Sequence, residues 1–370
     1  MMVIGVPREI KCDEFRVGAT PLNVAQWVAE GLAVHVQRGA GTGSGFDDAA
    51  YEKAGAVMHE SMASLYGATD LIVKVKEPQP DEYPLLNASH TLFCYIHLAP
   101  LKELADVLMR KKVTVIAYET VAEGEELPLL RPMSEIAGKM AALVGAHHLN
   151  RYQGGSGILV GGAAGVLPAR VLVIGAGNAG YHAARVASGM GADVTVLNRT
   201  TPKLLFIEET LAGVDTALYT PAQLEALLPE TDIVVSSVLI HGGAKAPKLI
   251  TRQMLATMKK GSVLVDIAID QGGTAETSRP TTHRDPTFIE EGVIHYCVAN
   301  MPGAYPRTST IALTNATSPY VIKIAKEGPE GVMRSRALRE GLNVYRGAIV
   351  KGAVAEGLGV ACTPLERAVR

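Results

Sequence analysis

The stretch VLVIGAGNAG, residues 171–180, decides the fold of this chain. Four aliphatic residues run directly into the pattern G-x-G-x-x-G, and a helical pattern follows from Ala183. This order of strand, tight turn and helix is the context in which the glycine pattern binds dinucleotides. Gly175 permits the sharp turn, Gly177 lets the backbone approach a diphosphate, and Gly180 lets helix and strand pack closely. The diphosphate would sit at the N-terminus of the helix, where free N–H groups favour negative charge.

The segments after the glycine pattern continue the alternation of strands and helices. The run ADVTVL at 192–197 predicts a second strand, and aliphatic runs at 232–238, 262–267 and about 293–298 predict three more. Strands that alternate with helical segments in this way form parallel sheets. We therefore expect a Rossmann-like dinucleotide-binding domain here.

The residues before the glycine pattern show the same alternation. A helix is expected at 21–30, because Thr20 is a good N-cap and Pro21 suits the first turn. Apolar runs that predict strands lie at 3–6, 33–37, 70–75, 91–96 and 113–118. The run DLIVKV at 70–75 is continuous enough for a buried parallel strand. This region predicts a second α/β unit without a glycine fingerprint.

Two helical segments are expected to join these units. One begins at Ser134 and runs to about Tyr152, and the other is the C-terminal part from Thr308, which reads as helical with no strand. The predicted fold class is α/β, with two doubly wound, Rossmann-like parallel-sheet domains joined by long helices. Residues 1–132, completed by C-terminal helices at 308–370, form the expected substrate domain, and residues 133–307 form the dinucleotide-binding domain.

Composition excludes several classes of protein. The 370 residues carry a net charge of −2 without a stripe of Lys and Arg, which argues against a nucleic-acid partner. No apolar run approaches the length of a membrane span, and the N-terminus lacks a signal-peptide pattern. The four cysteines are scattered without CxxC, which indicates reduced thiols in a cytoplasmic protein. Ten histidines without HExxH make a metal site unexpected.

Seven segments together resemble one known family. They are IGVPREIK at 4–11 with EFRV at 14–17, KVKEP at 74–78, TLFCYIHLA at 91–99, PMSE at 132–135, GAGNAGYHAARVASGMGA at 175–192, DIAIDQGG at 266–273 and VANMP at 298–302. In this order they cover essentially the whole chain and resemble the alanine dehydrogenase family, a relative of the nucleotide-binding subunit of proton-translocating transhydrogenase. The resemblance implies reversible NAD(P)-dependent conversion of L-alanine to pyruvate and ammonium, an active site in an interdomain cleft, and assembly into a homohexamer.

Cationic side chains are the candidates for binding the substrate carboxylate. Arg16 lies in a loop after the first predicted strand and offers a planar fork for a carboxylate. Lys76 lies at the carboxyl end of the predicted strand at 70–75, where open α/β sheets place ligands. The resemblance implies that both bind substrate. Lys74 shares the strand face of Lys76 but lies farther from its end, so it ranks lower.

Proton transfer requires a titratable group near the same edge. His97 follows the predicted strand TLFCYI, and the resemblance makes it the candidate general acid and base. Asp270 is assigned to orienting the substrate amino group or the attacking water. Asp266 is an alternative carboxylate that we expect to be structural, and Tyr95 is expected to pack near the pocket.

The candidate cofactor residues lie in the second predicted domain. The fingerprint glycines hold the diphosphate, while the resemblance implies that Ser134 bonds a phosphate and that Asn300 and Met301 hold the nicotinamide. Apolar residues at strand ends that suit a nicotinamide ring are Val238, Leu239 and Ile267.

One position departs from the family. NAD enzymes of this fold place an acidic residue after the second strand, where it accepts hydrogen bonds from the adenosine ribose. Here Asn198 and Arg199 follow ADVTVL. Asn198 still suits a 2′-hydroxyl, but the carboxylate that repels a 2′-phosphate is missing and Arg199 is suited to bind one. NAD is the expected cofactor, with NADP as a possibility.

Two alternatives stay open at this point. The same fold accommodates a dehydrogenase of another small 2-amino or 2-oxo acid, because one methylene changes discrimination by only about 1–3 kcal/mol. A nucleotide-binding subunit that exchanges hydride with a partner protein is the other alternative, although Lys76 and His97 have no purpose in that role.

Overall fold

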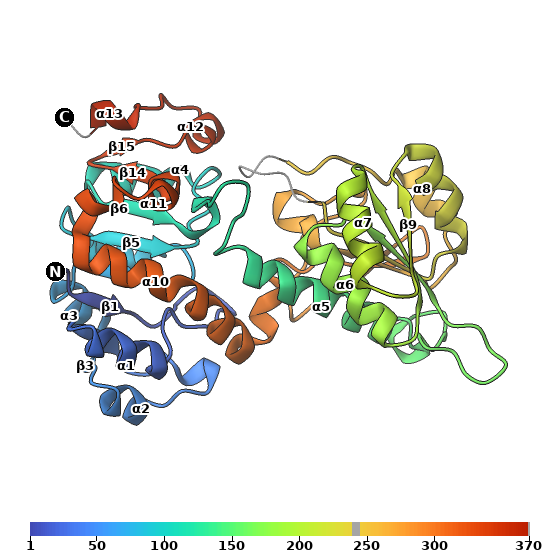
Figure 1. Cartoon of the computed structure of the whole chain (residues 1–370), viewed down its shortest axis with the longest axis horizontal. Coiled ribbons are helices and arrows are strands. Elements are labelled where there is room, and N and C mark those ends of the chain that lie inside the picture. The colour runs from blue at the N-terminus through green and yellow to red at the C-terminus, as the bar shows by residue number, and fades with distance from the viewer. Residues whose placement is uncertain (239–244, 369–370) are drawn as a thin grey trace. The chain divides into compact units, whose positions relative to one another are not determined.

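The computed structural model describes residues 1–238 and 245–368 of the chain. Those residues form two units, each of which has its own sheet (Figure 1). The first unit comprises Met1–Met133 together with Tyr305–Arg370, and the second comprises Ser134–Ala304. The first unit is therefore built from both ends of the chain, while the second is one continuous segment.

The first unit contains a sheet with the strand order β15-β14-β6-β5-β4-β1-β2-β3. Its strands are β1 (Ile4–Val6), β2 (Val34–Gln37), β3 (Val57–His59), β4 (Leu71–Val73), β5 (Thr91–Cys94), β6 (Thr114–Ala117), β14 (Leu342–Tyr345) and β15 (Ala348–Ile349). The six strands β1 to β6 are parallel. Their order is the doubly wound one, which reverses direction between β1 and β4.

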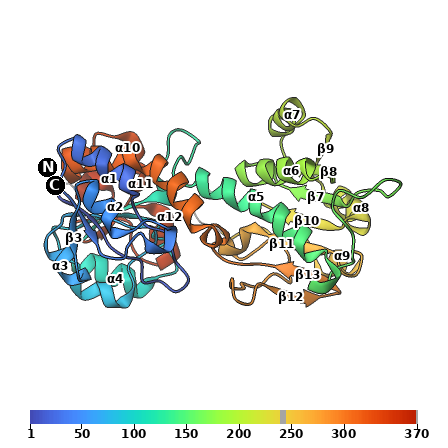
Figure 2. The same cartoon turned by 90° about the horizontal axis from the view of Figure 1, so that it is seen from below.

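Helices cover both faces of this sheet. They are α1 (Pro21–Ala29), α2 (Asp48–Lys53), α3 (Met62–Gly67), α4 (Lys102–Arg110), α10 (Pro306–Val332), α11 (Arg336–Gly341), α12 (Gly352–Leu358) and α13 (Leu365–Ala368). In Figure 2, α1 and α10 lie on one side of the unit, and α3 and α4 lie on the other. Helix α1 begins as the sequence predicts, because the Thr20 side chain accepts a hydrogen bond from the backbone N–H of Asn23 in a capping box.

The prediction of a C-terminal segment without strands is wrong. Strand β14 pairs antiparallel with β6, and β15 pairs antiparallel with β14. The buried residues Leu342 and Val344 give β14 an apolar pattern only four residues long, too short to be distinguished from the helical residues around it. The 308–370 segment therefore completes the first sheet as well as its helical layer.

The second unit has the strand order β12-β13-β11-β10-β7-β8-β9. Its elements are α5 (Arg131–His148), whose first three residues belong to the first unit, β7 (Arg170–Ile174), α6 (Asn178–Gly189), β8 (Asp193–Asn198), α7 (Thr201–Thr210), β9 (Val214–Leu218), α8 (Pro221–Leu227), β10 (Ile233–Ser236), α9 (Arg252–Ala256), β11 (Val263–Asp266), β12 (Thr287–Glu290) and β13 (Val293–Tyr296). All pairs are parallel except β12 with β13. Six of the strands repeat the doubly wound order, which confirms the predicted fold class of two mainly parallel α/β sheets.

Several strands are shorter than predicted at their carboxyl ends. The predicted strand at 70–75 ends at Val73, and the one at 91–96 ends at Cys94. Lys76 and His97 therefore lie in connecting segments beyond the strands. Helix α5 begins at Arg131, before the expected start at Ser134, and ends at His148. Pro132 does not prevent the earlier start, because proline is tolerated in the first turn of a helix.

Candidate active site

Three predicted substrate residues follow three adjacent strands of the first unit. Arg16 lies beyond the carboxyl end of β1, Lys76 beyond β4 and His97 beyond β5. These strands are neighbours in the order β5-β4-β1 and run parallel, so their carboxyl ends meet at one edge of the sheet. The edge between β1 and β4 is where the strand order reverses, and open α/β sheets bind ligands there.

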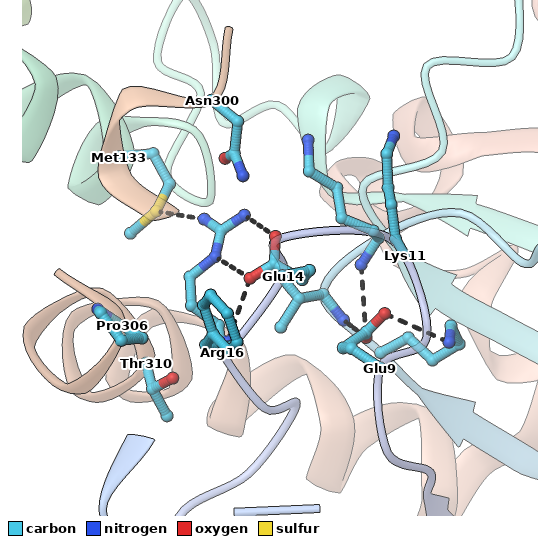
Figure 3. A network of polar contacts seen from close by, with 12 residues as sticks. Glu9, Lys11, Glu14, Arg16, Met133, Asn300, Pro306 and Thr310 are labelled. Atoms are coloured by element: carbon cyan, nitrogen blue, oxygen red, sulfur yellow. Dashed lines mark hydrogen bonds and ion pairs between the residues drawn. The ribbon is translucent and has the colours of Figure 1, made fainter. Parts of the chain in front are cut away.

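Arg16 is buried and held in a fixed plane by Glu14 and Met133 (Figure 3). Its Nε donates to Glu14 Oε1 at 2.7 Å, and its Nη2 donates to Glu14 Oε2 at 2.6 Å. Its Nη1 lies 3.1 Å from the sulfur of Met133. Glu14 Oε1 also accepts the backbone N–H of Arg16 at 3.0 Å. The guanidinium is thus oriented before any substrate arrives.

The charges of this pair stabilise each other. Burial alone raises the pKa of Glu14, but the hydrogen bonds and charge of Arg16 lower it below its usual range. The charge of Lys76 lowers the pKa of Glu14 further. Burial lowers the pKa of Arg16, yet Glu14 raises it above its usual range. Glu14 therefore carries its negative charge in direct contact with Arg16.

Lys74 forms ion pairs within a buried cluster of charged side chains. Its Nζ lies 3.2 Å from Glu9 Oε2 and 2.7 Å from Glu82 Oε1, and all three side chains are buried. Tyr66 donates its hydroxyl to the same Glu82 oxygen at 2.7 Å. Burial raises the pKa of Glu9 even though Lys74 lowers it. The ammonium group of Lys74 is thus bound by carboxylates of the protein itself.

The same cluster holds the segment that carries Lys76. Glu9 Oε1 accepts the backbone N–H of Val75 at 2.6 Å and that of Lys76 at 3.4 Å. Because Glu9 follows β1 and Lys76 follows β4, this carboxylate ties together the two connecting segments at the point where the strand order reverses.

His97 has an unusual backbone and a nearby carboxylate. Its φ of 43° lies in the left-handed region, which costs energy for a residue other than glycine and is common at functional sites. Its backbone N–H donates to Glu119 Oε1 at 2.7 Å, and its Nδ1 lies 3.8 Å from the same oxygen. The side chain is 49% exposed, so it remains accessible to a ligand.

Tyr95 stacks on His97 and is affected by the charge of Arg16. Its ring lies parallel to that of His97 with the centroids 6.0 Å apart, and its hydroxyl donates to the carbonyl of Leu129 at 2.5 Å. Burial raises the pKa of Tyr95, while the charge of Arg16 lowers it. The structure therefore places Arg16, Lys76 and His97 beyond three adjacent parallel strands, with Glu14 against Arg16 and Tyr95 stacked on His97.

Glu14 and Glu119 were not expected from the sequence. Glu119 follows β6 in the short 3-10 helix η3 (Tyr118–Thr120), so it lies beyond the strand next to the one that precedes His97. That placement is a usable signal, because acidic residues after neighbouring parallel strands lie at the same edge. Glu14 lies only two residues before Arg16, and such spacing alone does not predict a paired geometry.

Each of the three fingerprint glycines of the second unit is a glycine for a different physical reason. Gly175 has a φ of 101°, which favours glycine. A Cβ at Gly180 would lie 1.7 Å from the carbonyl oxygen of Gly175, so close packing requires glycine there. A Cβ at Gly177 would meet no atom within 4 Å. Neither the backbone nor the packing of the protein requires Gly177, which is consistent with space kept for a diphosphate at the start of α6.

Ser134 lies close to this helix start. Helix α5 crosses the beginning of α6 so closely that a Cβ at Gly138 would lie 2.1 Å from the carbonyl oxygen of Ala179. Ser134 is four residues before Gly138 on α5, about one helical turn away. The structure therefore places this predicted phosphate ligand near the fingerprint.

Asn198 is tied to the fingerprint turn. Its Oδ1 accepts the backbone N–H of Ala176 at 3.2 Å, and its Nδ2 donates to the carbonyl and hydroxyl oxygens of Thr200, each at 3.0 Å. The neighbouring Arg199 is exposed, and its charge lowers the pKa of Tyr219, which burial raises. The side chain that replaces the usual acidic residue thus shapes the turn through both its oxygen and its nitrogen.

Asp266 and Asp270 have different environments. Asp266 is fully buried, and its Oδ2 accepts the backbone N–H of Thr274 at 2.6 Å and the hydroxyl of Ser278 at 2.6 Å. It therefore holds the loop that follows β11, as expected of a structural residue. Asp270 is exposed on the 3-10 helix η7 (Ile267–Gln271) within that loop.

The remaining predicted cofactor residues are distributed around the second unit. Val238 and Ile267 are partly buried beyond the ends of β10 and β11, whereas Leu239 lies outside the described residues. Asn300 has a φ of 58°, and its carbonyl oxygen lies 3.2 Å from Nε2 of His283. Met301 is buried at the start of η8 (Met301–Ala304).

Two kinds of feature are absent from residues 1–238 and 245–368. No helix in these ranges is long and apolar enough to cross a membrane. The same residues contain no group of three or more His, Cys, Asp or Glu side chains that could hold a metal ion.

Comparisons with known proteins agree with this architecture. The model of the alanine dehydrogenase/PNT N-terminal domain matches residues 5–137, and that of the C-terminal domain matches residues 141–352. The chain is 50% identical to the alanine dehydrogenase of Halomonas elongata and 48% identical to that of Bacillus subtilis. The alignments cover 97% of both chains in the first case, and 100% of this chain and 98% of the relative in the second.

A solved structure of an L-alanine dehydrogenase is 43% identical in sequence and superposes with a TM-score of 0.93. That comparison covers 97% of this chain and 99% of the solved one. The agreement extends over both units, their order along the chain and nearly every residue, so the chain belongs to the alanine dehydrogenase family of oxidoreductases that act on an amino acid.

Proposed function

We propose that this chain catalyses the reversible, NAD-dependent oxidative deamination of L-alanine to pyruvate and ammonium. The observation that carries the proposal is the buried Arg16–Glu14 pair, which presents an oriented guanidinium at the same sheet edge as Lys76 and His97, where the strand order reverses. An oriented cation, a second cation and a titratable group are what a small 2-amino acid needs for binding and proton transfer.

In this proposal the first unit binds and activates the substrate. Arg16 binds the substrate carboxylate through its planar fork, and Lys76 adds a second positive charge that polarises the carbonyl oxygen of pyruvate in the reverse direction. His97 removes a proton from the water that attacks the imine of pyruvate. Its backbone N–H donates to Glu119 and its Nδ1 lies 3.8 Å from the same carboxylate oxygen, so Glu119 orients the ring.

The second unit is assigned to the nicotinamide cofactor, which would supply the hydride acceptor for the reaction. Gly175, Gly177 and Gly180 would hold its diphosphate at the start of α6, and Ser134 would bond a phosphate. Asp270 orients the amino group or the water. The nicotinamide contacts are assigned to Val238, Leu239, Ile267, Asn300 and Met301.

We also propose that the protein uses NADP as well as NAD. Asn198 is uncharged, and the exposed Arg199 lies beside it after β8. An uncharged amide does not repel a 2′-phosphate, and a guanidinium binds one well. This pair supports dual cofactor use.

We also propose that the enzyme is a cytoplasmic homohexamer. All four cysteines are free thiols, as expected in a reducing compartment. Large apolar side chains that are exposed in the second unit include Leu143, Leu159, Val166 and Leu167, and burying them would favour association of copies. Sedimentation at micromolar concentration tests this, with six times the 39.0 kDa mass of the chain as the expected result.

The activity is tested with the purified chain alone. We expect L-alanine with NAD or NADP to produce the absorbance of reduced nicotinamide, and pyruvate with ammonium to consume it. Turnover without a partner protein eliminates a transhydrogenase-like subunit. A panel of small amino acids then decides whether alanine is preferred, and faster turnover of another amino acid would replace it as the substrate.

A further inference from the structure

The carboxylate of Glu14 lies directly against the cation that we assign to the substrate. It takes the Nε and Nη2 edge of the Arg16 guanidinium with two hydrogen bonds of 2.7 and 2.6 Å, and both side chains are only 1% exposed. In such a buried position charges interact much more strongly than in water. A ligand bound to Arg16 is therefore also close to a fixed negative charge.

Two cations and one carboxylate belong to the proposed substrate-binding edge of the first unit. Arg16 and Lys76 are positive, and Glu14 cancels one of these charges through direct contact with Arg16. Lys74, Glu9 and Glu82 form their own buried cluster, in which carboxylates already bind the ammonium group. A second negative charge on a ligand bound at Arg16 would lie close to the buried carboxylate of Glu14, which repels it.

We propose that Glu14 is a specificity-determining residue that restricts the site to 2-oxo and 2-amino acids with a single negative charge. The inference rests on the proposed function, because it takes Arg16 as the carboxylate-binding residue. The fixed orientation of Arg16 and the rejection of doubly charged acids are two consequences of the same carboxylate. Selectivity of this kind depends on a repulsive group as much as on an attractive one.

The inference is tested with two planar inhibitors of almost equal size. Oxamate carries one negative charge and oxalate carries two at neutral pH, so their competition with pyruvate separates charge from shape. We expect the wild-type protein to bind oxamate more tightly than oxalate. In Glu14→Gln the ratio of the oxalate to the oxamate inhibition constant should fall about tenfold or more, because one negative charge is lost at the same volume.

Two further variants separate charge from position. Glu14→Asp keeps the charge but shortens the side chain, so the inhibitor ratio should stay while the KM for pyruvate rises. Glu60→Gln removes the carboxylate from an exposed pair with Arg38, joined at 2.6 Å, and should leave the ratio and the KM unchanged. This control makes the same chemical change in an Arg–Glu pair on the surface of the same unit.

The outcomes distinguish this inference from the function on which it rests. If the wild-type protein oxidises alanine but binds oxalate as tightly as oxamate, the inference is wrong and the function stands. An unchanged ratio in a folded Glu14→Gln protein overturns it as well. Should Glu14→Gln fail to fold, the ratio of the two inhibition constants in the wild type and in Glu14→Asp tests the inference instead. A changed ratio in Glu14→Asp contradicts the role of charge. Absence of alanine oxidation by the wild type overturns the proposed function itself.

Discussion

At the scale of single residues, His97 is the side chain on which proton transfer depends in the proposed reaction. We expect His97→Ala to lower kcat by at least about 100-fold, because general acid–base catalysis contributes about 10²–10⁴-fold. Binding of reduced cofactor, followed by its fluorescence, should be nearly unchanged, since the fingerprint glycines belong to the other unit. His59→Ala, which changes a histidine of the same unit outside the candidate site, is the control. Activity above about one hundredth of the wild type would remove His97 from this role.

We expect Asn198 to decide the choice between NAD and NADP. The wild-type protein should use NADP at least comparably with NAD, and Asn198→Asp should shift the preference strongly towards NAD. Two like charges about 4 Å apart cost about 4 kcal/mol at an effective dielectric of 20. The ratio of kcat/KM for the two cofactors measures the shift. A wild-type protein that rejects NADP would contradict the assignment of Arg199.

The same substitution has a structural cost that the sequence does not reveal. A carboxylate at position 198 can keep the contact with the backbone N–H of Ala176, but it cannot donate to the carbonyl oxygen of Thr200 as the amide does. Asn198→Ser, which removes the amide without adding charge, is the matched control. It should weaken the binding of both cofactors without reversing the preference.

At the scale of elements, the crossing of α5 and α6 depends on one residue without a side chain. A Cβ at Gly138 would lie 2.1 Å from the carbonyl oxygen of Ala179, which is backbone and cannot move aside cheaply. We expect Gly138→Ala to lower the free energy of unfolding by about 1–3 kcal/mol, as overpacking does. It should also weaken cofactor binding, because it displaces the start of α6.

Gly189, which lies on α6, the other helix of this crossing, is the control for this substitution. A Cβ there would meet no atom within 4 Å, so Gly189→Ala should leave stability unchanged or raise it by up to about 1 kcal/mol, the difference in helix propensity. Urea denaturation measures both variants. Equal stability of Gly138→Ala and Gly189→Ala would show that α5 does not press on α6.

The sequence predicts which elements form better than where they end. The apolar runs identify ten strands of the two sheets, because each run is buried and distinct from its neighbours. Strands β3, β9 and β12 were not predicted, since their residues are largely exposed or only partly buried and give no apolar run. Strands β14 and β15 were missed because they are short and lie among helical residues.

The sequence likewise predicts part of the candidate site. Arg16, Lys76 and His97 are titratable groups that follow strands, so the sequence identifies them. Whether Lys74 or Lys76 meets a ligand depends on where β4 ends, and its end at Val73 places Lys74 against Glu9 and Glu82. A contact between segments far apart in the chain has no local pattern.

At the scale of the whole molecule, the two units have separate hydrophobic cores, and the proposed function assigns them different ligands. Cofactor at 100 times its Kd should add about 2.7 kcal/mol to the stability of the unit that binds it. Amides of β7, β10 and β11 should then exchange hydrogen more slowly, and those of β1, β4 and β5 should change less. Hydrogen-exchange mass spectrometry with NAD measures the difference. Equal protection of both sheets would contradict a cofactor site built by the second unit.

The pairing of β14 with β6 has a consequence for synthesis on the ribosome. About 225 residues separate the end of β6 from the start of β14, which takes about 10–45 s to translate at 5–20 residues per second. Throughout that interval β6 is an unpaired edge strand. Its four residues are all buried in the folded protein, and unpaired edges of this kind pair with other chains. The second unit, being one continuous segment, can finish folding before the first. The nascent chain therefore needs shielding at an early strand until its last residues emerge.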